Sequence, residues 1–264
     1  MLTIAPAAHT VLVDRLRRAG CVFAEDEADV LVESAATDEQ LESMVAQRID
    51  GLPLEHVVGW AEFAGLRISV GPGVFVPRRR SELLVEHARR LARPGSVVVD
   101  LCCGSGAIGL AIAAAVTGIE LIAADIEPAA VQWARRNVEP IGGTVFAGDL
   151  YNALPPSVRG RVDVLVCNAP YVPDDEIAML PREARLHEPL VTLAGGGDGL
   201  DVQRRVLADA QRWLVASGAV LIETGEHQAD RTAELFRAEG FSARIAHDND
   251  LDATVVIGLV PGLP

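Results

Sequence analysis

The sequence has 264 residues, of which 50% are hydrophobic and 23% are charged, a composition typical of a folded protein with one large domain or with a medium and a small one. Its 37 acidic residues exceed its 23 basic ones, for a formal net charge of −14, and every basic residue is an arginine. The absence of lysine excludes Schiff-base chemistry and the lysine of a phosphate-binding P-loop, and the net acidity argues against duplex nucleic acid as a partner.

Cysteine usage and apolar segment length indicate the compartment. The chain has four cysteines, Cys21, Cys102, Cys103 and Cys167. They form no C-x-x-C pair and the six histidines are scattered, so we predict neither a disulfide framework nor a metal site. Residues 1–8 lack the basic residues of a signal peptide, and the longest apolar stretch, residues 107–119, is too short to span a bilayer. The sequence predicts a cytoplasmic protein without a membrane segment, and it leaves the oligomeric state open.

Residues 1–52 are predicted to form a small helical domain. Apolar residues recur there at helical spacing, as at Leu12 and Leu16 and again at Ala28 and Leu31. Ten acidic residues and four arginines occupy much of the remaining surface. A glycine and a proline end this stretch, which indicates a boundary.

Residues 53–76 are predicted to link this domain to the rest of the chain. Two short segments, residues 60–63 and 66–70, are rich in strand-forming residues and are joined by a turn that contains Gly65. This pattern predicts a β-hairpin linker.

From residue 77 to residue 264 the pattern alternates between buried strands and helices. Continuous apolar runs predict parallel strands at residues 97–100, 121–125, 162–167 and 219–223. The predicted helices are residues 81–91, headed by Ser81, 108–116, 128–138 and 200–214, and the chain closes with a predicted hairpin of residues 241–246 and 253–260. The alternation predicts an α/β fold with a doubly wound, Rossmann-like sheet that binds ligands at the carboxyl ends of its strands.

A glycine-rich turn follows the first of these strands. Gly104-x-Gly106-x-x-Gly109, with Asp125 twenty-one residues after Gly104, fits the dinucleotide-binding fingerprint. Glycines allow the backbone to approach a ligand closely, and the following helix offers free N–H groups. An NAD-dependent oxidoreductase is therefore one hypothesis.

A second hypothesis starts from the acidic residue at the end of that strand. Asp100-x-Cys102-x-Gly104-x-Gly106 resembles the acidic-x-Gly-x-Gly-x-Gly loop of S-adenosylmethionine-dependent methyltransferases, with Cys102 in place of the first glycine. In that superfamily, carboxylates after the next two strands bind the ribose hydroxyls and the adenine amino group, roles that the resemblance assigns to Asp125 and Asp149. It also implies a seven-stranded class I methyltransferase sheet. The cofactor-binding residues that it implies are Asp100, Cys102, Cys103, Gly104, Ser105, Gly106, Asp125, Ile126, Asp149, Leu150 and Asn168.

The predicted strand of residues 162–167 leads into Asn168-Ala169-Pro170-Tyr171. This tetrapeptide resembles the Asn-Pro-Pro-Tyr motif of methyltransferases that act on planar amino groups, either the exocyclic amines of nucleobases or the side-chain amide of glutamine. An amide nitrogen is a poor nucleophile because its lone pair is delocalised, so the enzyme must hold that nitrogen in line and draw the lone pair out of conjugation. We predict that the Asn168 side-chain oxygen and the Ala169 carbonyl each accept one N–H of the target. Pro170 favours an extended backbone before it, and Tyr171 is predicted to stack on the target amide.

Further segments resemble one family, the protein-(glutamine-N5) methyltransferases (HemK/PrmC-like), which methylate the glutamine of a Gly-Gly-Gln tripeptide in release factors, with relatives that act on a ribosomal protein. The matching segments are residues 53–59, 73–78, 82–85, 188–189, 195–201 and 223–225. The resemblance implies S-adenosylmethionine as cofactor and a protein partner that carries the target glutamine. The substrate-binding residues that it implies are Phe75, Asn168, Pro170 and Tyr171.

Three departures from the family pattern indicate an offshoot. Cys102 replaces a glycine and Ala169 replaces a proline. The family's Pro-Arg-Pro-x-Thr-Glu stretch reads Pro-Arg-Arg-Arg-Ser-Glu over residues 77–82. The arginine run 78–80 is either a solvated turn or an anchor for an acidic partner.

Three hypotheses compete with glutamine methylation: methylation of exocyclic amines on nucleic acid, the NAD-dependent oxidoreductase, and a cofactor-binding protein without catalysis. The net acidity argues against the first. Residues 195–199, which are rich in glycine but lack the lysine of a phosphate cradle, are predicted to form a flexible connection near the target site.

Overall fold

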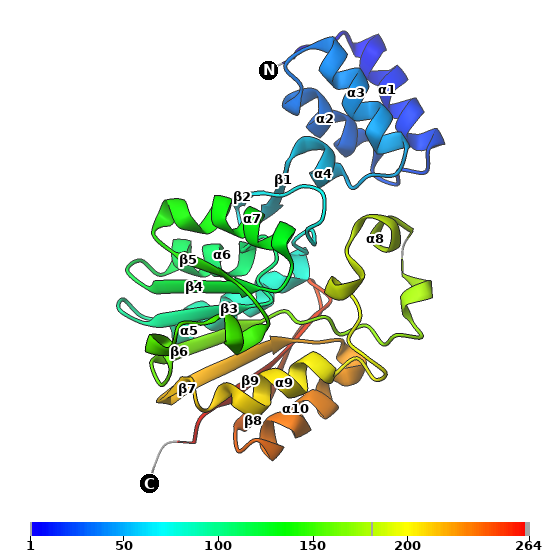
Figure 1. The fold of residues 1–264 in the computed structure, drawn as a ribbon. Coiled ribbons are helices and arrows are strands. Elements are labelled where there is room, and N and C mark those ends of the chain that lie inside the picture. Colours follow the sequence, from blue (N-terminus) through cyan, green and yellow to red (C-terminus); the bar gives the residue numbers. More distant parts are fainter. Residues whose placement is uncertain (1, 181, 262–264) are drawn as a thin grey trace.

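Three helices form a small N-terminal unit in the computed structural model, which describes residues 2–180 and 182–261 (Figure 1). They are α1 (Pro6–Arg18), α2 (Ala24–Ser34) and α3 (Asp38–Ile49). Their inward faces bury Leu16, Leu31 and Val45 in a core of their own. Thr37 begins α3 by accepting a hydrogen bond from the backbone N–H of Gln40 at 3.1 Å. The helical unit has the position along the chain that the sequence predicted.

A short helix and a hairpin follow. Helix α4 (Leu54–Val58) ends at Gly59, and strands β1 (Trp60–Phe63) and β2 (Leu66–Ser69) pair antiparallel. Phe63 and Ile68 are fully buried in the core of the large sheet, so the apolar side of the hairpin packs with the sheet, while Arg67 of β2 forms an ion pair with Glu33 of α2. We propose domain boundaries at residues 52 and 76 on this basis.

Seven strands form one sheet in the order β5-β4-β3-β6-β7-β9-β8. They are β3 (Val97–Leu101), β4 (Glu120–Asp125), β5 (Thr144–Ala147), β6 (Val162–Cys167), β7 (Leu214–Glu223), β8 (Ser242–Asp248) and β9 (Ala253–Leu259). The first five are parallel, whereas β9 pairs antiparallel with β7 and with β8. The strand order reverses between β3 and β6, which opens a ligand-binding crevice at their carboxyl ends. The predicted seven-stranded sheet is confirmed.

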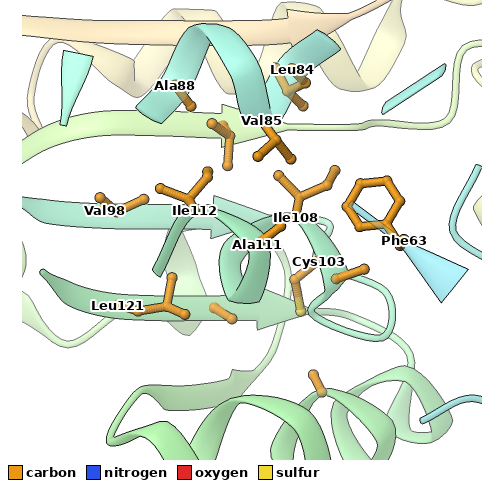
Figure 2. Packing of buried hydrophobic residues seen from close by; sticks show 14 of the residues in the cluster. Phe63, Leu84, Val85, Ala88, Val98, Cys103, Ile108, Ala111, Ile112 and Leu121 are labelled. Atoms are coloured by element: carbon orange, nitrogen blue, oxygen red, sulfur yellow. The ribbon is translucent and has the colours of Figure 1, made fainter. Parts of the chain in front are cut away.

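Helices cover both faces of the sheet. They are α5 (Glu82–Leu91), α6 (Ala107–Ala115) and α7 (Pro128–Val138) on one face, and α9 (Asp201–Ala210) and α10 (Ala229–Ala238) on the other. Figure 2 shows Leu84 and Ala88 of α5 packing near Ile112 of α6 beside Val98 of β3. Helix α8 (Arg182–His187) lies in the long connection between β6 and α9. Within the two described ranges, no helix is long and apolar enough to cross a membrane.

The remaining elements are single 3₁₀ turns between the longer ones. They span Arg79–Ser81, Glu139–Ile141, Leu150–Ala153, Pro156–Val158, Ile177–Met179, Leu190–Thr192 and Glu226–Gln228.

The structure differs from the predicted helices in two respects. The helix predicted over residues 200–214 ends at Ala210, and strand β7 begins at Leu214. The apolar residues at the end of the predicted helix therefore belong to a strand. Helix α10 had no counterpart among the predicted elements. Ser81 stands at the N-cap of α5, as predicted, although it makes no side-chain capping hydrogen bond and its hydroxyl has another partner described below.

Candidate cofactor and substrate site

Loops after four parallel strands line a cavity of about 560 Å³. They contribute residues 102–105, 125–127, 148–150 and 168–172, while residues from the 75–81 and 188–193 segments line its other walls. The volume is typical of a site for a small molecule, and the position is the crevice where the strand order reverses.

Most of the predicted site residues line this cavity. They are Phe75, Cys102, Cys103, Gly104, Ser105, Asp125, Ile126, Asp149, Leu150, Asn168, Ala169, Pro170 and Tyr171. Asp100 and Gly106 do not line it. Gly106 turns the backbone into α6 and packs against α7, where an added Cβ would lie 2.7 Å from Val138 Cγ2. Gly106 therefore shapes the loop and is not placed to touch a ligand.

The glycine loop uses left-handed backbone conformations. Gly104 has φ +54°, Gly106 has φ +76° and Cys102 has φ +56°. A side chain in this conformation costs about 1–2 kcal/mol, which gives a physical reason for glycine at the position of Cys102 in related loops. The Cys102 side chain packs partly into the core beside Cys167.

Asp125 ends β4 and faces both the loop and the cavity. Its Oδ2 accepts a hydrogen bond from Gly104 N at 2.8 Å, and its Oδ1 accepts one from Glu127 N at 2.9 Å. Burial raises the pKa of this carboxyl, and the two backbone donors oppose the rise. Each oxygen can accept a second hydrogen bond, so the carboxylate can still bind ligand hydroxyls.

Asp149 lies farther along the same wall of the cavity. Its Oδ2 accepts a hydrogen bond from Arg205 Nη2 at 2.5 Å, and Arg205 also lines the cavity. The next residue, Leu150, has φ +48°. The predicted adenine contact therefore has an arginine beside it that the sequence pattern did not indicate.

Asp100 lies beneath the glycine loop and does not line the cavity, so its predicted contact with the cofactor stays a prediction. It is fully buried, its Oδ2 accepts a hydrogen bond from Gly109 N at 2.9 Å, and its Oδ1 has no hydrogen-bond partner in the described part of the chain. Burial raises the pKa of this carboxyl from 3.8 to about 7. Asp100 thus ties the end of β3 to α6.

We expect this carboxyl to make the folding stability depend on pH. Because its pKa is raised in the folded protein, the neutral form stabilises the fold fully below about pH 4, and this contribution is lost as the pH rises towards 7. Asp100→Asn keeps an acceptor for Gly109 and removes the titration. Thermal unfolding between pH 4 and pH 8 should show the midpoint of the unchanged protein falling relative to that of the variant, and a constant difference across this range would refute the assignment.

The Asn168 side chain is oriented by a neighbour. Its Nδ2 donates a hydrogen bond to Ser81 Oγ at 3.1 Å, which leaves Oδ1 as the free acceptor. Ala169 is buried, and the hydrogen bonds of the described residues include none to its carbonyl. Two acceptors therefore remain at the predicted position of the target nitrogen.

Tyr171 lines the cavity, and its predicted stacking on the target amide stays a prediction. Its hydroxyl donates to Glu223 Oε1 at 3.5 Å, and its carbonyl accepts a hydrogen bond from Gln228 Nε2 at 3.0 Å. Burial raises the pKa of the Tyr171 hydroxyl, so this hydroxyl stays protonated at neutral pH. The ring is held at its outer end as part of the cavity wall.

Two arginines of the 78–80 run turn inward, so the run is not a simple solvated turn. Arg78 pairs with the buried Glu188, and its guanidinium lies 5.1 Å from the ring centroid of Phe75. Arg80 Nε lies 3.5 Å from Glu223 Oε1. Arg79, the middle arginine of the run, is exposed.

Sequence reasoning did not identify Ser81, Glu188 or Glu223 as part of this site. Glu223 carried a usable signal, because it ends a parallel strand as Asp125 does. Glu188 lies in an irregular segment, and its only signal was the family resemblance of residues 188–189, which assigned it no role.

The glycine-rich segment 195–199 is tied to the site by hydrogen bonds, which argues against the predicted flexible connection. Gly195 N donates to Val172 O at 2.8 Å, and Asp198 forms ion pairs with Arg204 and Arg231, each at 2.5 Å. A Cβ on Gly199 would lie 2.3 Å from the carbonyl oxygen of Tyr171, so glycine permits close packing there.

Comparisons with known proteins agree with this geometry. The family model for the methyltransferase small domain matches residues 65–198. A release factor glutamine methyltransferase of Mycolicibacterium smegmatis is 38% identical over 251 residues, which cover 93% of this chain and 84% of that protein. A 4-amino-L-phenylalanine/4-methylamino-L-phenylalanine methyltransferase of Streptomyces pristinaespiralis is 35% identical over 203 residues, which cover 74% of this chain and 69% of that protein.

A solved structure supports the fold. The crystal structure of a methyltransferase from Pyrococcus furiosus superposes with a TM-score of 0.57 at 18% identity, and the match covers 75% of this chain and 90% of that one.

Proposed function

The chain belongs to the release factor glutamine methyltransferase family, and from this premise we propose that it methylates the side-chain amide nitrogen of a glutamine in a peptide-chain release factor. The observation that carries the proposal is the pair of free acceptors, Asn168 Oδ1 and the Ala169 carbonyl, at the edge of the cavity. Release factors act in the cytoplasm, so we propose the same compartment for this enzyme.

The residues around the cavity fit S-adenosylmethionine, the methyl donor of this enzyme class. Its sulfonium supplies an electrophilic methyl group. We assign the ribose hydroxyls to the spare acceptor positions of Asp125 and the adenine end to Asp149 and Leu150. The left-handed turn at Gly104 lets the loop backbone approach a ligand.

Catalysis requires a planar amide to present its nitrogen lone pair. Asn168 Oδ1 and the Ala169 carbonyl each accept a hydrogen bond from one N–H of the target. The two N–H groups are thereby fixed, and the nitrogen lone pair can point towards the methyl group of the donor. Both acceptors are neutral and preorganised, because the first is fixed by Ser81 and the second belongs to the backbone. Tyr171 and Phe75 supply apolar walls that exclude water from this end of the cavity.

A second candidate substrate is an aromatic amine of a small molecule, favoured by the 35% identity to the aminophenylalanine methyltransferase. Such an amine also offers two N–H groups to the same acceptors.

Labelled methyl transfer to a panel of acceptors tests the proposal. The panel consists of a release-factor fragment containing Gly-Gly-Gln, the same fragment with asparagine in place of the glutamine, 4-amino-L-phenylalanine, and single-stranded and duplex nucleic acid. We expect label on the first fragment alone. Label on the amino acid supports the second candidate, and label on nucleic acid would overturn the substrate class.

A further inference from the structure

A buried glutamate stands behind the substrate end of the cavity. Glu223, the last residue of β7, is 1% exposed and does not itself line the cavity. Its neighbours Arg80, Ser81 and Tyr171 all line it. Glu223 can therefore affect a bound substrate only through these residues.

Three polar side chains face the Glu223 carboxylate. The Tyr171 hydroxyl donates to Oε1 at 3.5 Å, and Arg80 Nε lies 3.5 Å from the same oxygen. The Ser81 hydroxyl also faces this carboxylate and favours its charged form, and Glu223 Oε2 has no other hydrogen-bond partner among the described residues. Ser81 Oγ in turn accepts the hydrogen bond from Asn168 Nδ2 at 3.1 Å. Ser81 thus stands between the buried charge and the amide that we place at the target nitrogen.

The direction of these hydrogen bonds is set by the carboxylate. An ionised carboxylate can only accept, so the single hydroxyl hydrogen of Ser81 is directed to Glu223. Towards Asn168, Ser81 Oγ can then only accept a hydrogen bond, so Asn168 must donate one from its Nδ2. The Asn168 Oδ1 consequently faces the substrate. We propose that Glu223 is a positioning residue that acts through Ser81 to keep the oxygen of Asn168, and not its NH₂ group, towards the target amide.

The inference rests on the proposed role of Asn168 as an acceptor. It also predicts what happens when the hydrogen bonds between Glu223, Ser81 and Asn168 reverse their direction. If Glu223 carries a proton or is replaced by glutamine, its side chain can donate to Ser81. The Ser81 hydroxyl can then donate to Asn168 Oδ1, and Asn168 presents NH₂ to the target. Two N–H groups cannot bond to each other, so the acceptor is lost.

The groups around Glu223 determine the pH at which such a reversal occurs. Burial raises the pKa of Glu223, whereas Ser81, Arg80 and Tyr171 oppose the rise. The other charged groups facing this corner are Arg78 and its partner Glu188, behind Arg80 and Tyr171. Activity should therefore fall as the pH falls through the pKa of Glu223, because the protonated carboxyl becomes a donor.

Glu223→Gln tests the proposal against Glu226→Gln, the same change at an exposed residue three positions further on. For Glu223→Gln we expect kcat to fall about 10²-fold, as for loss of one preorganised group at a reacting atom. The KM for the Gly-Gly-Gln fragment and the Kd for S-adenosylmethionine should stay within a few-fold, and the acid limb of the kcat profile should disappear. Glu226→Gln should behave as the unchanged protein. A Glu223→Gln variant with full kcat and the original pH profile would overturn the proposal.

Variants of Ser81 test whether it transmits the effect. Ser81→Thr keeps the hydroxyl and should retain most of the activity, whereas Ser81→Ala should lose it. In the Ser81→Ala background, Glu223→Gln should cause no further loss of activity, because the hydroxyl that links Glu223 to Asn168 is already absent. Independent, multiplying losses would show that Glu223 acts by another route and would overturn the proposal.

A spectroscopic readout keeps the inference separate from the proposed function. The side-chain amide resonances of Asn168, assigned by their loss in Asn168→Ala, report which partner its NH₂ group has. They should shift with pH in the unchanged protein and in Glu226→Gln, and should not in Glu223→Gln. If no glutamine is methylated, the proposed function fails while this readout still stands. If the Asn168 amide resonances of the unchanged protein do not shift with pH, the positioning role is overturned.

Discussion

Asn168→Ala is expected to lower kcat for the Gly-Gly-Gln fragment by about 10²–10³-fold, the cost of removing one preorganised group from a reacting atom. We propose Asn168 Oδ1 as one of two acceptors for the target N–H groups, and the hydrogen bond from its Nδ2 to Ser81 orients the side chain. Without it the amide rotates, and its lone pair stays in conjugation with its carbonyl. Because the interaction forms fully only in the transition state, kcat and kcat/KM should fall together.

Steady-state kinetics and calorimetry check this result. The Kd for S-adenosylmethionine should stay within a few-fold, because Asp125 and the glycine loop carry most of that affinity. Asn152→Ala, the same change at an exposed asparagine, is the matched control and should keep full activity. An Asn168→Ala variant that turns over at the normal rate contradicts the assigned role.

Asp125→Ala is expected to raise the Kd for S-adenosylmethionine by about 10–100-fold. A hydrogen bond to a charged group contributes about 1.5–3 kcal/mol, and 1.4 kcal/mol corresponds to tenfold in affinity. The substitution also leaves Gly104 N–H and Glu127 N–H without their acceptor, so the loop that approaches the cofactor loses its support. We expect the free energy of unfolding to fall by about 1–3 kcal/mol for the same reason.

Calorimetric titration and chemical denaturation measure the two effects. Asp230→Ala, at an exposed aspartate on α10, is the control for the loss of one negative charge. Asp125→Asn, which keeps one oxygen acceptor, should lie between the unchanged protein and Asp125→Ala. Unaltered cofactor affinity in Asp125→Ala would show that the carboxylate does not contact the cofactor.

The place of the Asn168–Tyr171 loop in the fold could be predicted from the sequence because its signals are local. Asn168 to Tyr171 follow a continuous apolar run, and a parallel strand delivers the residues after it to the carboxyl edge of the sheet. The unusual backbone at Cys102 was also foreseeable, since the resembling loop carries glycine there and the structure gives φ +56°.

The network behind the loop could not be predicted from local signals. Arg78 and Glu188 are 110 residues apart in the chain and meet only through the tertiary fold. A run of three arginines resembles a solvated surface turn unless its buried glutamate partners are known. The hydrogen bond from Gly109 N to Asp100 could not be predicted either, because the motif gives the position of Asp100 but not the direction of its side chain.

The most direct test of the account is mass-spectrometric location of the methyl group after the purified enzyme acts on an intact release factor with S-adenosylmethionine. We predict one methyl group on the side-chain amide of the glutamine in Gly-Gly-Gln, and none after Asn168→Ala. A methyl group on any other residue, or an unmethylated release factor alongside methylated 4-amino-L-phenylalanine, would contradict the central claim.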